Sequence, residues 1–297
     1  MQRHKFDDDG KFADGADSRA LPASNPCENP ELARRRRGFI LFYAVLFTAD
    51  AFLGQLARMG SLPFTHGLEY PPWTLPGLAQ WMLLDLIVFA GMLALLGLRV
   101  TRWERRPLHV GVGMATNTSP GHECARGYTL GIAMCLFSFA LTAAIGWIGV
   151  SGHIPLPSLT ACIPLWGIIT MFQAGVEEVI FRGWMLPLSI ERWGPGRGVL
   201  TQAVLFAGLH LLVDANTGLA VLHALAFGLF AGFYAYQRKS LWGTIGIHSA
   251  YNFSALLLSA VSSAPLGPEG WQIVVIALTA AAIIPVKKLK DLPRIPR

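Results

Sequence analysis

The sequence predicts an all-α protein, a polytopic membrane helix bundle of about eight transmembrane helices, on three observations. Of the 297 residues, 53% are hydrophobic and 14% are charged, whereas a soluble domain carries about 25% charged residues. Apolar stretches of membrane-spanning length recur along the chain, and Lys and Arg gather in alternate connecting segments. This composition excludes a disordered protein, a basic nucleic-acid-binding domain and a secreted disulfide scaffold.

The apolar stretches define the expected spans. A bilayer core about 30 Å thick is crossed by roughly 20 mostly apolar helical residues. The fifth and sixth of the expected spans are short and closely spaced, so a re-entrant hairpin is the alternative for that pair. The eight stretches are residues 38–57, 76–98, 128–150, 159–188, 199–213, 219–236, 241–262 and 271–286.

The positive charges give the expected orientation. With the N-terminus in the cytoplasm, and with Arg182 counted on the same side, the cytoplasmic segments hold 23 of the 24 Lys and Arg residues. Arg58 is the exception. Such a bias is what the positive-inside rule predicts for a correct set of spans. We therefore expect an integral membrane protein with both termini in the cytoplasm. The membrane that we expect for it is the bacterial cytoplasmic membrane.

Charged side chains inside the fourth expected span are the first indication of a functional site, because charge is costly in a bilayer. The segment contains the adjacent residues Glu177 and Glu178, followed by Arg182. Glu178 and Arg182 are four residues apart and are predicted to pair on one helix face. Glu177 points about 100° away, into the bundle, where a carboxylate suits a general base. The alternative is a purely structural Glu–Arg pair, with Glu177 reaching the inner interface.

Two further spans carry the remaining candidates. His210 lies in the fifth span, and His248 and Asn252 are four residues apart in the seventh. That spacing puts His248 and Asn252 on one face, where both can address one bound group. An imidazole accepts or donates a proton, and an Asn amide can stabilise an oxyanion. His210 on its own would more often be an interhelical hydrogen-bonding residue.

Helix geometry places these groups at a similar depth. Counted from the inner ends of their spans at 1.5 Å per residue, Glu177 and His210 lie about 16 Å deep and His248 about 10 Å. One shared site is therefore expected. Packing roles are predicted for the other polar residues in the spans, with lining of a water path as the alternative for all of them except His223. An interfacial anchor role is predicted for Trp184. The residues assigned to packing are Asp50, Asp85, Gln173, Gln202 and His223.

The three elements Glu177-Glu178-xxx-Arg182, Phe206-xxx-His210 and His248-xxx-Asn252 together resemble the CPBP family. This family comprises the type II CAAX prenyl proteases and bacterial bacteriocin-processing or self-immunity proteins. The resemblance covers roughly residues 159–262. It implies an intramembrane peptidase in which Glu177 and His210 activate water, His248 with Asn252 holds the oxyanion, and Glu178 with Arg182 braces the site.

The resemblance leaves the cofactor open between none and a divalent metal such as zinc. Glu177, His210 and His248 would supply the three protein ligands that a catalytic zinc needs. The sequence has no HExxH helix, which is the usual zinc scaffold. We favour a site without a tightly bound metal.

The expected organisation and function follow from these observations. Residues 1–37 are predicted to be a disordered cytoplasmic tail, residues 38–158 N-terminal transmembrane helices, residues 159–262 a CPBP-like catalytic core, and residues 263–297 a last span with a basic cytoplasmic tail. The expected activity is hydrolysis of a membrane-associated or lipidated peptide or protein. The expected partners are membrane lipids and that substrate, with no nucleic acid. The alternatives are a non-enzymatic immunity or scaffold protein and a proton-coupled transporter.

Overall fold

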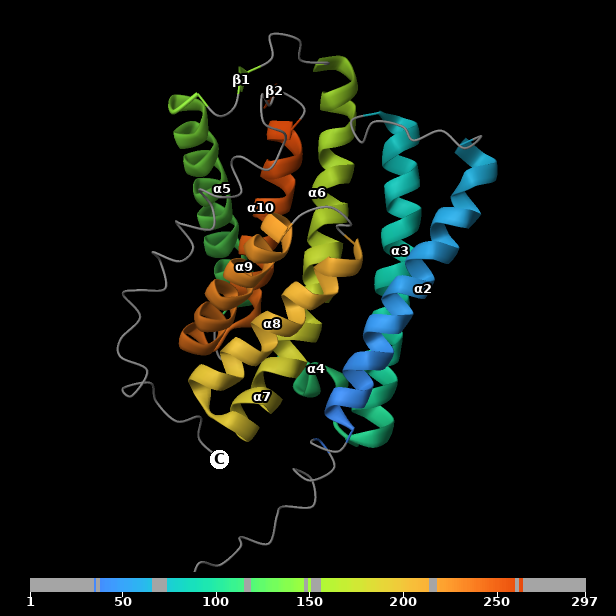
Figure 1. The fold of residues 1–297 in the computed structure, drawn as a ribbon, viewed down its shortest axis with the longest axis vertical. Helices are drawn as coiled ribbons and strands as arrows, with labels where there is room; N and C mark the ends of the chain where they lie inside the picture. The colour runs from blue at the N-terminus through green and yellow to red at the C-terminus, as the bar shows by residue number, and fades with distance from the viewer. Residues whose placement is uncertain are drawn as a thin grey trace, which may run out of the picture.

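The computed structural model describes most of the chain between residues 35 and 263. The described residues are 35, 38–65, 74–114, 119–146, 149–150, 156–213, 218–259 and 262–263. They are almost entirely helical (Figure 1). The predicted all-α class is therefore confirmed.

Within the described residues, seven long helices form the bundle, with shorter elements between them. The long helices are α2 (Phe39–Thr65), α3 (Leu75–Leu98), α5 (Pro120–Ala144), α6 (Leu156–Glu178), α8 (Pro195–Val213), α9 (Gly218–Arg238) and α10 (Leu241–Ser259). The short helices are α4 (Leu108–Gly111) and α7 (Leu186–Trp193), together with the π-helices η1 (Arg99–Trp103) and η2 (Val179–Met185). Two-residue strands β1 (Gly149–Val150) and β2 (Ser262–Ser263) pair antiparallel after α5 and α10.

Local sequence signals explain where several helices begin and end. The Thr74 side chain accepts a hydrogen bond from the backbone N–H of Gly77 and caps α3, with Pro76 in its first turn. Proline is well tolerated there because that backbone N–H has no helical partner. Helix α7 ends at Trp193 and is followed by Gly194, whose φ of 80° is one that glycine adopts without strain. Pro195 then begins α8.

Four of the described helical segments are long and apolar enough to cross a membrane. They are Leu75–Trp103, Pro120–Ala144, Cys162–Trp193 and Ala220–Arg238. Phe39–Gln55 is a shorter apolar helix. The eight-span count is not confirmed, because α8 and α10 are helical but do not meet the same criterion, and the eighth expected span lies outside the described residues. Integral membrane character is supported.

The helices are arranged so that α6 and α10 lie centrally. In Figure 1, α2 and α3 lie on one side of α6, and α5 lies on the other side of α10. Helix α10 packs extensively against both α5 and α6, and α8 packs against α7 and α9. The helices that carry the polar residues of the predicted site are therefore neighbours.

Glycines permit the close packing of α5 against α10. A Cβ atom at Gly127 would collide with the carbonyl oxygen of Gly243, and one at Gly131 would collide with the carbonyl oxygen of Ile247. A Cβ at Gly246 would in turn meet the carbonyl oxygen of Cys124. Small residues are the usual means by which membrane helices approach closely. Here they fix the position of α10, which carries His248 and Asn252.

We expect Gly127→Ala to destabilise the protein, because the added methyl group must push α5 away from α10. Overpacking of this kind costs about 1–3 kcal/mol. Thermal unfolding in detergent, followed by circular dichroism, measures the loss. Gly121→Ala is the matched control, since nothing lies within 4 Å of a Cβ at that position of the same helix. Equal unfolding temperatures for the two variants would contradict the role given to Gly127.

Candidate active site

The Glu178 carboxylate forms a buried ion pair with Arg182. Nη1 of Arg182 donates to Oε1 of Glu178 over 2.7 Å, and both side chains are fully buried. Glu178 is the last residue of α6 and Arg182 lies in η2, so the predicted four-residue pairing is confirmed. The π-helical turn that carries Arg182 is a distortion often found at functional sites.

The same carboxylate orients His248 of α10. Nδ1 of His248 lies 2.9 Å from Oε1 of Glu178. Because the ion-paired carboxylate accepts hydrogen bonds, Nδ1 is the donor, and Nε2 is left to face the other glutamate. Nε2 of His248 lies 3.9 Å from Oε2 of Glu177. That separation exceeds a hydrogen bond and is of the kind that a bridging water spans.

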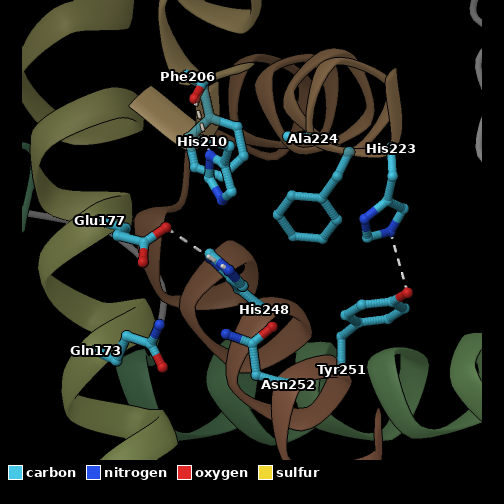
Figure 2. A pocket seen from close by; sticks show the side chains of 10 residues that line it. Gln173, Glu177, Phe206, His210, His223, Ala224, His248, Tyr251 and Asn252 are labelled. Atoms are coloured by element: carbon cyan, nitrogen blue, oxygen red, sulfur yellow. Dashed lines mark hydrogen bonds and ion pairs between the residues drawn. The ribbon is translucent and has the colours of Figure 1, made fainter. Parts of the chain in front are cut away.

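His210 of α8 is held by its own helix. Nδ1 of His210 lies 2.9 Å from the carbonyl oxygen of Phe206. A carbonyl oxygen can only accept, so Nδ1 carries a proton, and in the neutral imidazole Nε2 is an acceptor. Figure 2 shows the His210 ring pointing toward the space beside Glu177 and His248.

One cavity brings the predicted catalytic residues together. It has a volume of about 220 Å³, and Glu177, His210, His248 and Asn252 all lie in its wall. Glu178 and Arg182 lie behind this wall and are fully buried. Oε2 of Glu177 is buried and has no hydrogen-bond partner among the described residues. The remaining lining residues are Gln173, Phe206, His223, Ala224, Phe227 and Tyr251.

Aromatic rings enclose the charged groups. The guanidinium of Arg182 lies 4.4 Å from the ring centroid of Phe206 and 5.6 Å from that of Phe227. The Phe227 ring also lies 4.7 Å from the imidazole of His248. The faces of aromatic rings attract cations. These rings therefore stabilise Arg182 and keep solvent from the Glu178–Arg182 pair.

Sequence reasoning missed three polar residues of the cavity. Gln173 and His223 were assigned to packing, yet both line the cavity, as does Tyr251. The Tyr251 hydroxyl is hydrogen-bonded to Nε2 of His223 at 3.0 Å. The four-residue spacing between Gln173 and Glu177 was a usable signal. No candidate catalytic residue lies four residues from His223 in the sequence. Its partner Tyr251 lies on another helix, α10, and the two meet only in the tertiary structure.

Some residues of the cavity have the chemistry of metal ligands. Glu177, His210 and His248 offer donor types that zinc accepts. Within the described part of the chain, however, no group of three or more His, Cys, Asp or Glu side chains is placed so that it could hold a metal ion. The arrangement therefore does not fit a metal centre, and we derive no step through one.

Comparison with known proteins gives one match. Residues 159–254 match the family described as type II CAAX prenyl endopeptidase Rce1-like. This part of the chain is therefore similar to an Rce1-like domain. The match agrees with the resemblance found through the three motifs, and it supports a protease, that is, a hydrolase of peptide bonds. A search of curated proteins found no match.

Outside residues 159–254, a buried carboxylate binds Trp184, which follows Arg182 by two residues. Nε1 of Trp184 donates to Oε1 of Glu104 over 2.8 Å, and the Nε of Arg99 lies 3.4 Å from the same oxygen. The predicted interfacial role of Trp184 is wrong, because this ring is 1% exposed and packs on Phe39 and Phe42 of α2. The residues that cover Trp184 belong to α2 and to the segment after η1, and the sequence around Trp184 does not indicate them.

We expect Trp184→Phe to destabilise the protein by about 1–3 kcal/mol, the cost of leaving a buried acceptor unsatisfied. Burial already raises the pKa of the Glu104 carboxyl, while the Trp184 hydrogen bond and the charge of Arg99 lower it. Thermal unfolding in detergent measures the effect. Trp103→Phe is the control, since Trp103 is 65% exposed. A Trp184→Phe protein as stable as this control would refute the role of the hydrogen bond.

Proposed function

We propose that the protein is an intramembrane endopeptidase of the CAAX type, which hydrolyses a peptide bond of a membrane-associated or lipidated peptide or protein. One observation carries the proposal. Glu177, His210, His248 and Asn252 come from three separate helices and line a single cavity. They do so within the Rce1-like domain.

The charges of the site provide one mobile proton. With both carboxylates ionised, Glu177, Glu178 and Arg182 carry a net charge of −1. One proton on His248 or Glu177 makes the buried group neutral, which lowers the cost of its burial. Because Glu178 already holds Nδ1 of His248, this proton is exchanged at Nε2, on the side that faces Glu177. In the proposed reactive state this proton is on His248, so that Glu177 is ionised and free to accept a proton from water.

The first step of the proposed reaction is attack by water. A water molecule in the cavity donates one hydrogen bond to Nε2 of His210 and gives its other proton to the Glu177 carboxylate as its oxygen attacks the scissile carbonyl carbon. The resulting oxyanion accepts hydrogen bonds from the Asn252 amide and from Nε2–H of protonated His248. Donors placed for the charge that develops in the transition state are an effective source of catalysis.

The second step breaks the peptide bond. Protonated Glu177 transfers its proton to the leaving nitrogen as the tetrahedral intermediate collapses, so the products are a carboxylic acid and an amine. Glu177 returns to the carboxylate form, and the site is ready for another water. Glu178 and Arg182 take no part in bond making and act as positioning residues for His248.

The proposed topology puts both termini in the cytoplasm and the cavity nearer to that side. Water must reach the cavity for hydrolysis, and the polar lining of the cavity gives water hydrogen-bond partners. The cytoplasmic-side position rests on the charge bias of the loops. We propose membrane lipids and a peptide or membrane-protein substrate as the partners.

Comparing membrane peptidomes tests this function. Cells expressing the wild-type protein and cells expressing Glu177→Gln are analysed by mass spectrometry, and the expected result is a set of cleaved peptides found only with the wild type. Identical peptidomes, together with an intact cellular phenotype in the variant, would favour the non-enzymatic immunity or scaffold role. Solute uptake driven by a proton gradient would favour the transporter.

A further inference from the structure

Gln173 places a carboxamide in the cavity next to the proposed general base. It lies on α6 one turn before Glu177, so the two side chains share a helix face. Both line the cavity. In Figure 2, the amides of Gln173 and Asn252 lie on the same side of the line that joins Glu177 to His248. Two helices thus present carboxamides beside the reacting groups.

These two carboxamides differ from one that serves packing. The Gln202 amide donates to the carbonyl oxygens of Gly228 and Val199 over 2.7 and 3.1 Å, and so ties α8 to α9. Within the part of the chain that the structure describes, the side chains of Gln173 and Asn252 make no hydrogen bond. A polar group inside a helix bundle is costly without a partner. Water or a ligand must supply that partner.

The chemistry of a carboxamide identifies the ligand. It offers an N–H donor and a C=O acceptor side by side, which matches the N–H and C=O groups of a peptide backbone. An apolar substrate segment has few other polar groups to offer. A backbone in α-helical form uses its own N–H and C=O groups internally. A carboxamide in the cavity therefore binds a segment that has left the helical conformation.

We propose that Gln173 binds the substrate backbone at a peptide group adjacent to the scissile bond, so that the site takes an extended, unwound peptide segment. This inference rests on the proposed function. It separates two amide roles, since Asn252 holds the oxyanion at the scissile carbonyl while Gln173 sets the register of the neighbouring peptide group. Gln173 is then a substrate-binding residue.

Kinetics with a backbone-modified probe test the proposal. The probe is an internally quenched apolar peptide, prepared with and without an S-farnesyl group, and the full-length protein is assayed in detergent. Gln173→Ala is expected to raise KM about tenfold, the loss of one or two hydrogen bonds, with a smaller change in kcat. Gln173→Met, which keeps the length of the side chain, is expected to behave in the same way.

A double-mutant cycle makes the contact specific. Ester analogues of the probe replace, one at a time, each peptide N–H beside the cleaved bond. One analogue is expected to raise the wild-type KM by a similar factor and to cause no further loss with Gln173→Ala, because the two changes remove the same interaction. Gln55→Ala, on α2 and away from the cavity, is the control. An unchanged KM for Gln173→Ala, or fully additive losses with every ester, would overturn the proposal.

The outcomes separate this inference from the proposed function. Cleavage lost in Glu177→Gln but unaffected by Gln173→Ala overturns only the role of Gln173. Cleavage that persists in Glu177→Gln overturns the proposed function. In that case, fluorescence anisotropy measures the affinity of the probe in the absence of cleavage, and so still tests whether Gln173 binds a peptide backbone. The probe is suitable because backbone contacts are common to all peptides. Equal affinities of wild type and Gln173→Ala, or no binding to either, overturn the backbone site.

Discussion

Glu177→Gln is expected to reduce kcat by about 10²–10⁴-fold, the contribution of a positioned general base. A Gln side chain keeps the size of Glu177 and cannot take a proton from water. The fold is expected to persist, because Oε2 of Glu177 has no hydrogen-bond partner to lose among the described residues. Cleavage of the quenched peptide by purified protein, at matched unfolding temperature, measures the effect.

The control for this variant is a carboxylate of the same chain outside the site. Glu191→Gln removes an exposed carboxylate of α7 that pairs with Arg35 over 2.9 Å. Exposed pairs contribute about 0–1 kcal/mol, so this protein is expected to retain its activity and its stability. A Glu177→Gln protein as active as Glu191→Gln would remove the general base from the proposed mechanism.

Arg182→Met is expected to cost about 3–5 kcal/mol of stability, the penalty for leaving a buried charge without its partner. Glu178 would keep its hydrogen bond to His248 but lose its cationic partner, and the cation above Phe206 would be lost. Thermal unfolding in detergent should show a large decrease. Activity should also fall, because Glu178 would no longer be held in place to orient His248.

A second substitution separates stability from catalysis. Combining Arg182→Met with Glu178→Leu removes both charges, and replacing a whole buried pair by apolar groups is often neutral. Most of the stability is therefore expected to return, whereas activity stays low because His248 has lost the acceptor for Nδ1. Arg192→Met, at an exposed position of α7, is the control. A double variant with wild-type activity would refute the positioning role of Glu178.

Hydropathy and motif spacing predicted the helical class and most of the candidate site residues, because few sequences can place charged residues in a membrane-spanning helix. A buried charge inside an apolar helix is rare, so Glu177 and Glu178 stood out against their surroundings. Spacing of four residues predicted the Glu178–Arg182 pair and the shared face of His248 and Asn252. These are local properties of one helix, and a single sequence contains them.

Contacts between helices could not be predicted in the same way. Nothing in the sequence near Trp184 indicates that Glu104 accepts its indole N–H, since 80 residues separate the two. His223 likewise meets Tyr251 across a separation of 28 residues. The contact of Glu178 with His248 spans 70 residues. Each contact depends on which helices pack against each other, and the hydropathy of a segment does not indicate which helices those are.

The sequence by itself determined that the chain is an all-α membrane protein, and it identified the residues whose polarity needs an explanation. Periodicity along one helix fixes the face on which each of these residues lies, because the geometry of the α-helix is regular. Only the tertiary structure decided that the Glu178 carboxylate, besides pairing with Arg182, also holds His248, and that Gln173 lies in the cavity rather than in a packed interface. The physical reason is that the partners of a side chain are set by the packing of several helices. In this protein, the glycines of α5 and α10 set how closely these two helices approach each other.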